Sequence, residues 1–338
     1  MREFSSHLAS ESSSLLRRVH RATRSRKRSD DIGTLGPVST QPIIDVTDWA
    51  VRFPEPGGSD ANIWLLIPGS EGESALFKPV VAKEGRRQGE DWAEKAVEQV
   101  AGKIGVPTAR IEMATRNGHP GLLSFDLAGR GVEMQTGAVL VGEIDQRLVP
   151  RAKERLGHNL ANIGTVLSPL PAPAMEGGTF TGFDQFCGYL ILDALVANRD
   201  RHEENWAVLR ETDGVVTLAP SYDHGNSLGF NLLDARRLHQ LQSDPELVAW
   251  ARRGKADRFE GGRDLTLVDF AFRALAAASS GTAAYWLDRV QAATADAWET
   301  IIDSVPEMSR PCRMFCLQLL KTNQRRLLDG YQSSAPGR

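Results

Sequence analysis

The chain has 338 residues, a formal net charge of −3 and three cysteines. So small a charge gives no reason to expect a nucleic-acid partner or an anionic lipid surface, and no apolar run approaches the roughly 20 residues that span a bilayer. An apolar content of 41% and a charged content of 25% lie near globular averages, which predicts a buried core in one large two-lobed domain or two ordinary ones.

The cysteines Cys187, Cys312 and Cys316 are odd in number and cannot form a framework of disulfide bridges. Together with the mild charge and the lack of a long apolar run, this fits a reduced intracellular compartment, so we expect a cytoplasmic protein without a membrane partner. Cys312 and Cys316 lie four residues apart, but two thiols without nearby histidines rarely form a metal site. Buried structural thiols are the favoured interpretation.

Residues 1–40 are expected to form a basic tail outside the folded part. The densest cluster of cations runs from Arg24 to Arg28, in a stretch that is rich in serine and poor in large apolar side chains. Such a composition cannot bury enough apolar surface to offset the entropy of ordering the chain. The sequence therefore predicts a disordered, solvated tail.

Residues 41–130 are expected to form a small β-rich lobe that contains one helix. Apolar side chains recur at helical spacing over residues 91–104, and Gly105 and Pro107 follow where that helix should end. The expected strands of this lobe are residues 63–67, 75–78, 109–114 and 121–127.

Residues 131–338 are expected to form a larger, mainly helical lobe. The apolar run 183–196 suits a buried helix, and Asp213-Gly214 joins two short strands in a predicted hairpin. Those strands are residues 206–209 and 215–218, and the further predicted helices are residues 232–242, 265–278, 283–305 and 311–328. No element is assigned within residues 134–174, which mix apolar side chains with Pro and Gly.

Asp200 and Asn205 are the first candidates for chemistry, because an Asp followed five positions later by an Asn is the spacing of a kinase catalytic loop. In that chemistry the Asp accepts the proton of the attacking hydroxyl, and the Asn binds a Mg²⁺ that bridges the nucleotide phosphates. The spacing alone is a weak signal. It is strengthened by the hairpin and the second acid, Asp223, that follow in kinase order, and Asp223 is the expected principal Mg²⁺ ligand.

Lys78 ends a predicted strand and precedes the predicted helix 91–104. A strand lysine paired with a helical glutamate positions the α- and β-phosphates in kinases. Glu94 and Glu98, one turn apart, are both candidates for that glutamate, and either is also compatible with a solvated helix face.

Two glycine-containing segments are candidates for the loop over the phosphates. Gly57-Gly58-Ser59-Asp60 precedes the first predicted strand, and Gly69-Ser70-Glu71-Gly72 lies between the first two. Either could present backbone N–H groups to phosphate, and either could be an ordinary turn.

These motifs resemble those of the HipA-like kinases, whose pattern is Asp-Ala-Leu-Ile-x-Asn-x-Asp-Arg-His-x-x-Asn. Residues 193–205 read Asp-Ala-Leu-Val-Ala-Asn-Arg-Asp-Arg-His-Glu-Glu-Asn, and residues 219–229 are similar to the family's second motif. A third match is Leu-Phe-Lys-Pro at 76–79, followed by Asp-Trp-Ala-Glu at 91–94. The resemblance covers roughly residues 57–300.

The resemblance implies an α+β, bilobal fold similar to protein kinases and phosphatidylinositol kinases, with a small β-rich N-lobe and a larger helical C-lobe. It also implies serine/threonine phosphotransfer from ATP with Mg²⁺. On this basis Asp200, Lys78 and Glu94 are the predicted catalytic residues, and Asn205 and Asp223 the metal ligands. The predicted nucleotide-binding residues are Gly57, Gly58, Ser59, Lys78, Ser124, Phe125, His202, Asn205 and Asp223.

The partners implied by the resemblance are a protein substrate, with a translation factor as one candidate, and an antitoxin of a toxin–antitoxin module. The separate N-terminal subdomain of the fuller HipA proteins has no counterpart here, and Asp60 stands where relatives commonly carry basic residues. The acceptor-binding surface is expected in the charged stretch 236–263.

Three functions stay open at this point: a protein serine/threonine kinase, a small-molecule or lipid-headgroup kinase of the same fold, and an inactive kinase fold that acts as a binding module. Retention of Lys78, Asp200, Asn205 and Asp223 disfavours the third. Apart from its predicted nucleotide contact, His202 could act in metal binding or as a general base, but a lone histidine beside such a loop more often braces it by hydrogen bonds. Arg201 could contact phosphate or Asp200, or form a structural ion pair.

Overall fold

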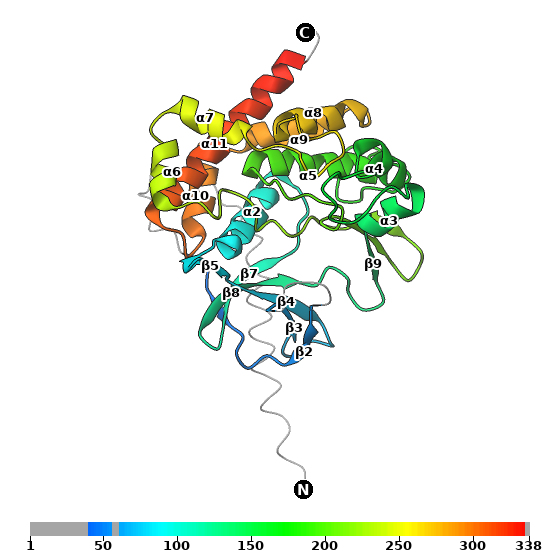
Figure 1. Cartoon of the computed structure of the whole chain (residues 1–338). Helices are drawn as coiled ribbons and strands as arrows, with labels where there is room; N and C mark the ends of the chain where they lie inside the picture. The colour runs from blue at the N-terminus through cyan, green and yellow to red at the C-terminus, as the bar shows by residue number, and fades with distance from the viewer. Residues whose placement is uncertain (1–39, 56–60, 335–338) are drawn as a thin grey trace, which may run out of the picture. The chain divides into compact units, whose positions relative to one another are not determined.

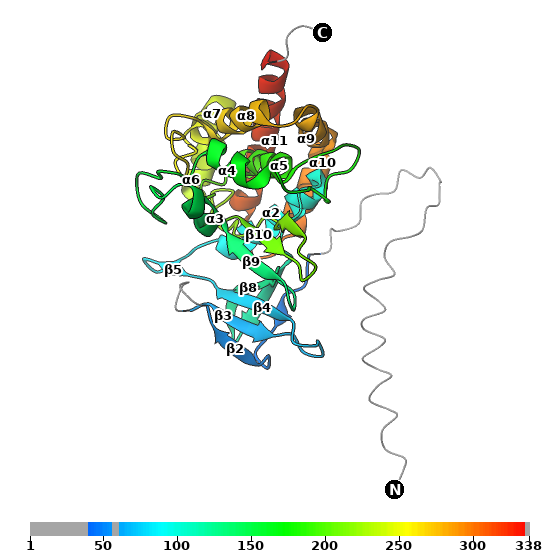
Figure 2. The same cartoon turned by 90° about the vertical axis from the view of Figure 1, so that its right-hand side faces the viewer.

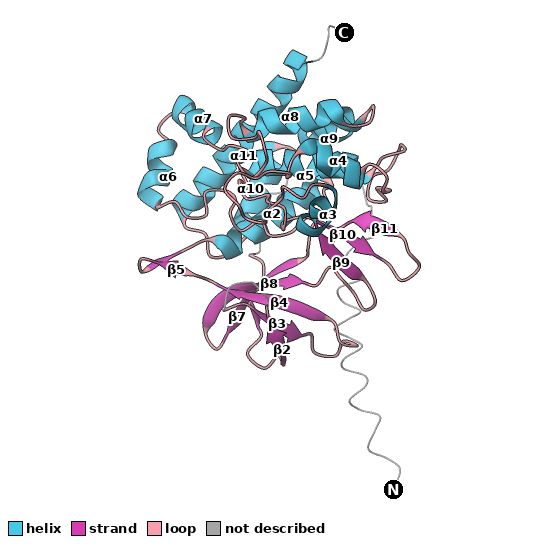
Figure 3. Ribbon diagram, turned by 45° about the vertical axis from the view of Figure 1, so that its right-hand side comes forward, coloured by secondary structure: helices cyan, strands magenta, loops and turns pink. Residues whose placement is uncertain are grey.

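The computed structural model describes residues 40–55 and 61–334. The basic tail and the Gly57-Gly58-Ser59 segment predicted from the sequence therefore lie outside the described residues. The described part contains a strand-rich lobe and a helical lobe (Figures 1 and 3). This is the α+β, bilobal, kinase-like arrangement expected from the sequence.

The strand-rich lobe is built on a six-stranded sheet with the order β1-β7-β8-β4-β3-β2. Neighbouring strands are antiparallel except for the edge strand β1, which pairs in parallel with β7. The strands are β1 (Ile44–Asp45), β2 (Val51–Pro54), β3 (Ile63–Leu66), β4 (Ser74–Pro79), β7 (Ile111–Arg116) and β8 (His119–Phe125). A separate small hairpin joins β5 (Ala82–Lys83) to β6 (Arg86–Arg87).

The side chains of β4 alternate between two faces of the sheet, one facing the core of this lobe and the other facing the helical lobe. Ala75 and Phe77 pack in a small apolar cluster on one face of the sheet. Leu76 and Lys78 therefore point to the opposite face, since successive side chains of a strand alternate. Across the ladder Leu76 is paired with Ser124 of β8, so these residues share the face that meets the helical lobe.

Helix α2 (Glu90–Ile104) belongs to the N-lobe in sequence but is buried in the core of the helical lobe. It contacts β7 on one side and α9 and α10 on the other, and Figure 1 shows it between the sheet and the helices. Trp92, Val97 and Val100 join the main apolar cluster. Each such side chain contributes about 1.5–3 kcal/mol on burial, so α2 is held firmly between the lobes. Gly105 ends the helix with φ 76°.

A second, three-stranded sheet lies beneath the helices, with the order β11-β10-β9 (Figure 2). Its strands are β9 (Glu133–Thr136), β10 (Ala207–Arg210) and β11 (Val216–Leu218). The β10–β11 pair is the hairpin that Asp213-Gly214 predicted. Strand β9 comes from a segment to which no element was assigned, and pairs with β10 across about 70 residues of sequence.

The helical lobe is organised around α5 (Gly182–Val196), which is buried on every side. A capping box between Thr181 and Asp184 fixes its first turn. The other helices are α3 (Gly137–Ile144), α4 (Leu160–Leu167), α6 (Asp234–Gln240), α7 (Asp244–Arg252), α8 (Leu267–Ala277), α9 (Thr282–Ala292), α10 (Ala295–Ser304) and α11 (Arg310–Ser334). None of the helices in the described part of the chain combines the length and apolar character that crossing a bilayer requires.

The prediction of one helix over residues 283–305 was wrong, because the structure has two, α9 and α10. Thr294 interrupts the run, and its hydroxyl caps α10 by accepting a hydrogen bond from the N–H of Ala297. Helix α7 was not predicted either. It begins with Ser243 as cap and Pro245 in its first turn. Cys312 and Cys316 are buried in α11, and both are free thiols.

Candidate active site

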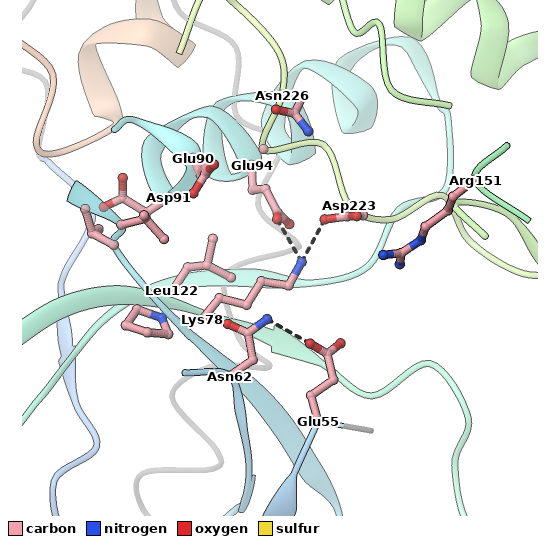
Figure 4. A pocket seen from close by; sticks show the side chains of 14 residues that line it. Glu55, Asn62, Lys78, Glu90, Asp91, Glu94, Leu122, Arg151, Asp223 and Asn226 are labelled. Carbon is pink, nitrogen blue, oxygen red and sulfur yellow. Dashed lines mark hydrogen bonds and ion pairs between the residues drawn. The ribbon is translucent and has the colours of Figure 1, made fainter. Parts of the chain in front are cut away.

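Lys78, Glu94 and Asp223 meet where the two lobes face each other (Figure 4). Lys78 Nζ lies 3.0 Å from Glu94 Oε1 and 2.9 Å from Asp223 Oδ1. The three residues come from β4, from α2 and from the loop after β11. Of the two glutamates left open by the sequence, Glu94 makes the contact with Lys78, and Glu98 pairs instead with Lys95 at 3.0 Å.

Charge in this triad is strongly coupled. Burial disfavours the charged lysine, but the carboxylates of Asp223 and Glu94 raise the pKa of Lys78 above its ordinary value. The Lys78 ammonium lowers the pKa of Asp223 to about 2. Burial raises the pKa of Glu94. At neutral pH the lysine and Asp223 are therefore both ionised, which suits them for binding phosphate and a cation respectively.

The segment that carries Asp200 is fixed by a buried ion pair. Arg201 donates to both carboxylate oxygens of Asp193, at 2.9 and 2.7 Å, and its Nη1 donates to the carbonyl oxygen of Asn205 at 2.8 Å. Arg201 and Asp193 are both almost fully buried. Arg201 thus holds the loop in place through a structural ion pair, which is one of the alternatives that the sequence left open. Ala197, with φ 55°, ends α5 and turns the chain into the loop.

Asn205 and Asp223 supply oxygen atoms of the type that Mg²⁺ binds. The Nδ2 of Asn205 donates to the carbonyl oxygen of Asp200 at 2.7 Å, so its amide oxygen stays available as a ligand. Asp223 adopts φ 60°, a left-handed conformation that is uncommon outside glycine. A neutral amide oxygen and an ionised carboxylate fit Mg²⁺, which is usually held by one or two carboxylates together with nucleotide phosphates.

Two cavities meet at Lys78 and Asp223. One, of about 410 Å³, is lined by Leu76, Phe125, Met134 and Tyr222 together with polar groups that include Ser124, His202 and Asn205. Its mixture of apolar walls and a few polar groups suits a nucleotide base and sugar. The other, of about 520 Å³, extends past Glu90 and Asn226. The described residues that line both cavities are Glu55, Lys78, Arg151 and Asp223.

The two candidate glycine segments have different surroundings. Glu55 and Asn62 flank residues 56–60, are joined by a 2.8 Å hydrogen bond, and line the cavity around Lys78. The other segment forms the turn between β3 and β4, where Glu71 and Gly72 line a different cavity. The neighbours of Gly57-Gly58-Ser59 therefore lie at the site, whereas the turn at 69–72 does not line it.

The sequence matches the HipA-like C-terminal domain family over residues 55–298. That span contains Lys78, Glu94, Asp200, Asn205 and Asp223. The chain belongs to the HipA-like family. No curated protein matches it.

Among solved structures, the HipA-like chain resembles a Helicobacter pylori proinflammatory kinase, CtkA, with a TM-score of 0.64, 18% identity, and coverage of 86% of this chain and 98% of that one. It is also similar to HipA in the Shewanella oneidensis MR-1 complex of HipA, HipB and operator DNA. That match has a TM-score of 0.48 and 12% identity, and covers 86% of this chain and 70% of that one. At such identity the first match establishes the kinase-like fold.

Three residues of the HipA-like site were missed by sequence reasoning. Arg258 Nη2 lies 2.6 Å from Asp200 Oδ1, and Asn226 Nδ2 donates to Asp200 Oδ2 at 2.5 Å. Arg151 lines both cavities. Asn226 lies within residues 219–229, the match to the family's second motif, and Arg258 lies within the charged stretch 236–263, but the spacing of neither residue pointed to the site. Arg151 carried no sequence signal.

His202 lies on the wall of the smaller cavity and also braces the loop that carries Asp200. Its Nδ1 accepts a hydrogen bond from the N–H of Glu204 at 3.2 Å. Burial lowers the pKa of His202, so the ring is neutral at physiological pH. The nucleotide contact and the bracing role considered from the sequence are both compatible with this position.

Proposed function

We propose that this HipA-like chain is an ATP-dependent serine/threonine protein kinase that uses Mg²⁺. The observation that carries the proposal is the ion-paired group of Lys78, Glu94 and Asp223, in which Lys78 and Asp223 line the same cavity as Asn205. A strand lysine, a helical glutamate and a loop aspartate joined in one ion-paired group are the parts that kinases use to hold nucleotide phosphates.

The adenine and ribose are assigned to the smaller cavity. Leu76 and Phe125 supply apolar surface there, and Ser124 lies on the same strand as Phe125. The phosphates then extend toward Lys78 and Asp223, where the two cavities join. Gly121 helps to set this geometry, because a Cβ at that position would lie 2.5 Å from the carbonyl oxygen of Lys78.

Asp200 is assigned as the catalytic base. In the transfer, the acceptor oxygen forms a bond to the γ-phosphorus, the bond from that phosphorus to the β–γ bridging oxygen breaks, and the acceptor proton passes to Asp200. Glu94 keeps the Lys78 ammonium directed at the phosphates. Mg²⁺ held by Asn205 and Asp223 would supply charge neutralisation on the phosphate oxygens.

The acceptor is proposed to be a serine or threonine hydroxyl of a protein, with a translation factor as one candidate class. An antitoxin partner is proposed on family membership alone. The three cysteines are free and buried, which is compatible with the reducing cytoplasm proposed for this chain.

Phosphotransfer can be tested with the full chain, Mg²⁺, ATP labelled at the γ-phosphate and cell lysate separated into protein, lipid and small-molecule fractions. Label in the protein fraction that depends on Asp200, and that is found on serine or threonine, supports the proposal. Label confined to lipid or small molecules assigns the same chemistry to a different acceptor. Failure of the chain to bind Mg–ATP or to transfer label to any fraction contradicts the kinase proposal.

A further inference from the structure

We infer that Arg151 is a phosphate-binding residue whose guanidinium contacts the polyphosphate tail of the nucleotide. This inference rests on the proposed kinase function and deepens it, because it adds a residue that neither the motifs nor the strand–helix pair contains. Arg151 lies in the connection between α3 and α4, far in sequence from every other proposed site residue.

The position of Arg151 is the first argument. With Lys78, Asp223 and Glu55, it lines both the smaller and the larger cavity. In Figure 4 its side chain is directed toward the space between Asp223 and Glu55. That boundary is where the phosphates must pass if the base occupies the smaller cavity and Lys78 and Asp223 hold the phosphate end.

The balance of charge around the cavities is the second argument. Lys78 and Arg151 are the only lysine or arginine among the described residues that line either cavity, whereas seven lining side chains are acidic. The seven are Glu55, Glu90, Asp91, Glu94, Asp126, Glu204 and Asp223. Lys78 is already paired with two carboxylates. Besides the proposed Mg²⁺, a further cation favours a polyanionic ligand in such surroundings, and the planar guanidinium matches phosphate in a two-point contact.

The anchoring of Arg151 is the third argument. Its backbone N–H donates to the buried carboxylate of Glu203 at 2.5 Å, and its Nε donates to Glu204 Oε2 at 2.5 Å. Glu203 and Glu204 occupy the two unspecified positions of the Asp-Arg-His-x-x-Asn motif. These two residues therefore tie the Arg151 loop to the catalytic loop, so the guanidinium keeps a fixed relation to Asn205.

An alternative is that the Arg151–Glu204 pair is only structural. The Arg151 side chain is 65% exposed, and exposed ion pairs contribute little to stability. The bond to Glu203 uses the backbone, so it survives any side-chain replacement. The structural alternative therefore predicts that removing the guanidinium changes neither the fold nor nucleotide binding, and this separates it from the phosphate role.

The test compares Arg151→Ala, Arg151→Lys and the control Arg147→Ala in the full chain, by calorimetric titration with Mg²⁺ and a non-hydrolysable ATP analogue, and with adenosine. Arg147 lies on the same connection and pairs with Asp145 at 2.7 Å, but it lines neither cavity. At position 151 φ is 59°, a left-handed conformation that costs alanine about as much as arginine. The substitution to alanine therefore adds no backbone strain of its own. Thermal unfolding verifies that each variant is folded.

We expect Arg151→Ala to weaken binding of the triphosphate about tenfold or more, the effect of losing a hydrogen bond to a charged group, while adenosine binding is unchanged. Arg151→Lys should retain part of the affinity, and Arg147→Ala all of it. Triphosphate affinity within about twofold of wild type in folded Arg151→Ala, or an equal loss for adenosine, overturns the inference. If the wild-type chain binds no Mg–nucleotide, the proposed function fails and the inference fails with it.

Discussion

Lys78 Nζ lies 3.0 Å from Glu94 Oε1, although the two residues belong to different parts of the molecule. Lys78 is on the sheet of the small lobe, whereas Glu94 is on α2, whose apolar face is buried in the core of the helical lobe. The ion pair therefore joins the two lobes across the proposed nucleotide site. Its geometry depends on packing over the whole length of α2 rather than on local sequence.

The first prediction concerns the choice between Glu94 and Glu98. Glu94→Gln should weaken Mg–ATP binding or slow phosphotransfer by about tenfold or more, because it removes the negative charge of the carboxylate that pairs with the Lys78 ammonium. Glu98→Gln is the matched control, one turn along the same helix and paired with Lys95, and it should have little effect. Nucleotide titrations and initial rates of both variants decide the matter, and a larger loss in Glu98→Gln contradicts the assignment.

The second prediction concerns the proposed base. Asp200→Ala should reduce phosphotransfer by about 10²–10⁴-fold, the contribution of a positioned general base, while Mg–ATP affinity stays close to wild type. Arg258 and Asn226 both contact the Asp200 carboxylate, so the orientation of this group is fixed from two sides. Asp213→Ala, in the exposed turn between β10 and β11, serves as control. Activity of Asp200→Ala within about tenfold of wild type removes Asp200 from the catalytic role.

The third prediction separates the two proposed metal ligands. Asp223→Asn should shift the Mg²⁺ dependence of ATP binding to higher concentration more than Asn205→Ala does, because Asp223 brings a full negative charge to a hard cation. The titration varies Mg²⁺ at fixed ATP for both variants and wild type. If Asp223→Asn loses stability yet keeps the magnesium dependence of wild type, Asp223 is a structural residue.

The fourth prediction concerns stability at acid pH. Burial lowers the pKa of His158 to about 4 from an ordinary 6.5. Its Nε2 accepts a hydrogen bond from Trp206 Nε1 at 3.1 Å, and its Nδ1 contacts the carbonyl oxygen of Arg258 at 2.7 Å. As the pH falls, the imidazole is therefore protonated in the unfolded chain before it is protonated in the folded one. The contribution of His158 to the free energy of unfolding is fully present above about pH 6.5 and falls by up to about 3 kcal/mol as the pH drops toward 4.

His158→Gln should be less stable at pH 7 but should lose less free energy of unfolding between pH 7 and 4.5 than wild type. Urea unfolding at a series of pH values measures this slope. The control is His239→Gln, at an exposed position on α6. Its curve of unfolding free energy against pH should run parallel to that of wild type. A His158→Gln curve that also runs parallel shows that His158 does not contribute to the pH dependence.

The fifth prediction concerns the close approach of β8 to β4. Gly121→Ala should destabilise the chain by about 1–3 kcal/mol, because the new Cβ forces the strands apart, and should weaken ATP binding through displacement of Lys78. Gly129→Ala, whose Cβ would have nothing within 4 Å, should be neutral. Thermal unfolding and nucleotide titration test both variants, and an unaffected Gly121→Ala refutes the proposed link between strand spacing and the lysine.

Much of the secondary structure and the proposed catalytic loop could be predicted from the sequence because their signals are local. Apolar residues at helical spacing located α2, a continuous apolar run located α5, and Asp213-Gly214 located the β10–β11 hairpin. Asp200, Asn205 and Asp223 lie within one short segment, and the spacing of the first two, followed by the hairpin and Asp223 in kinase order, indicated a kinase loop. The resemblance to HipA-like kinases then favoured Glu94 as the partner of Lys78, and that contact is present in the structure.

Other features were decided only by the tertiary structure. Strand β9 pairs with β10 across a long stretch of sequence, and Arg151 and Arg258 come to the site from connections without periodicity. Such contacts depend on how the helices pack around α5 and how Glu203, Glu204 and His158 hold the neighbouring loops. These contacts cannot be predicted from residue spacing, because the packed surfaces that stabilise them form only when the whole core has folded.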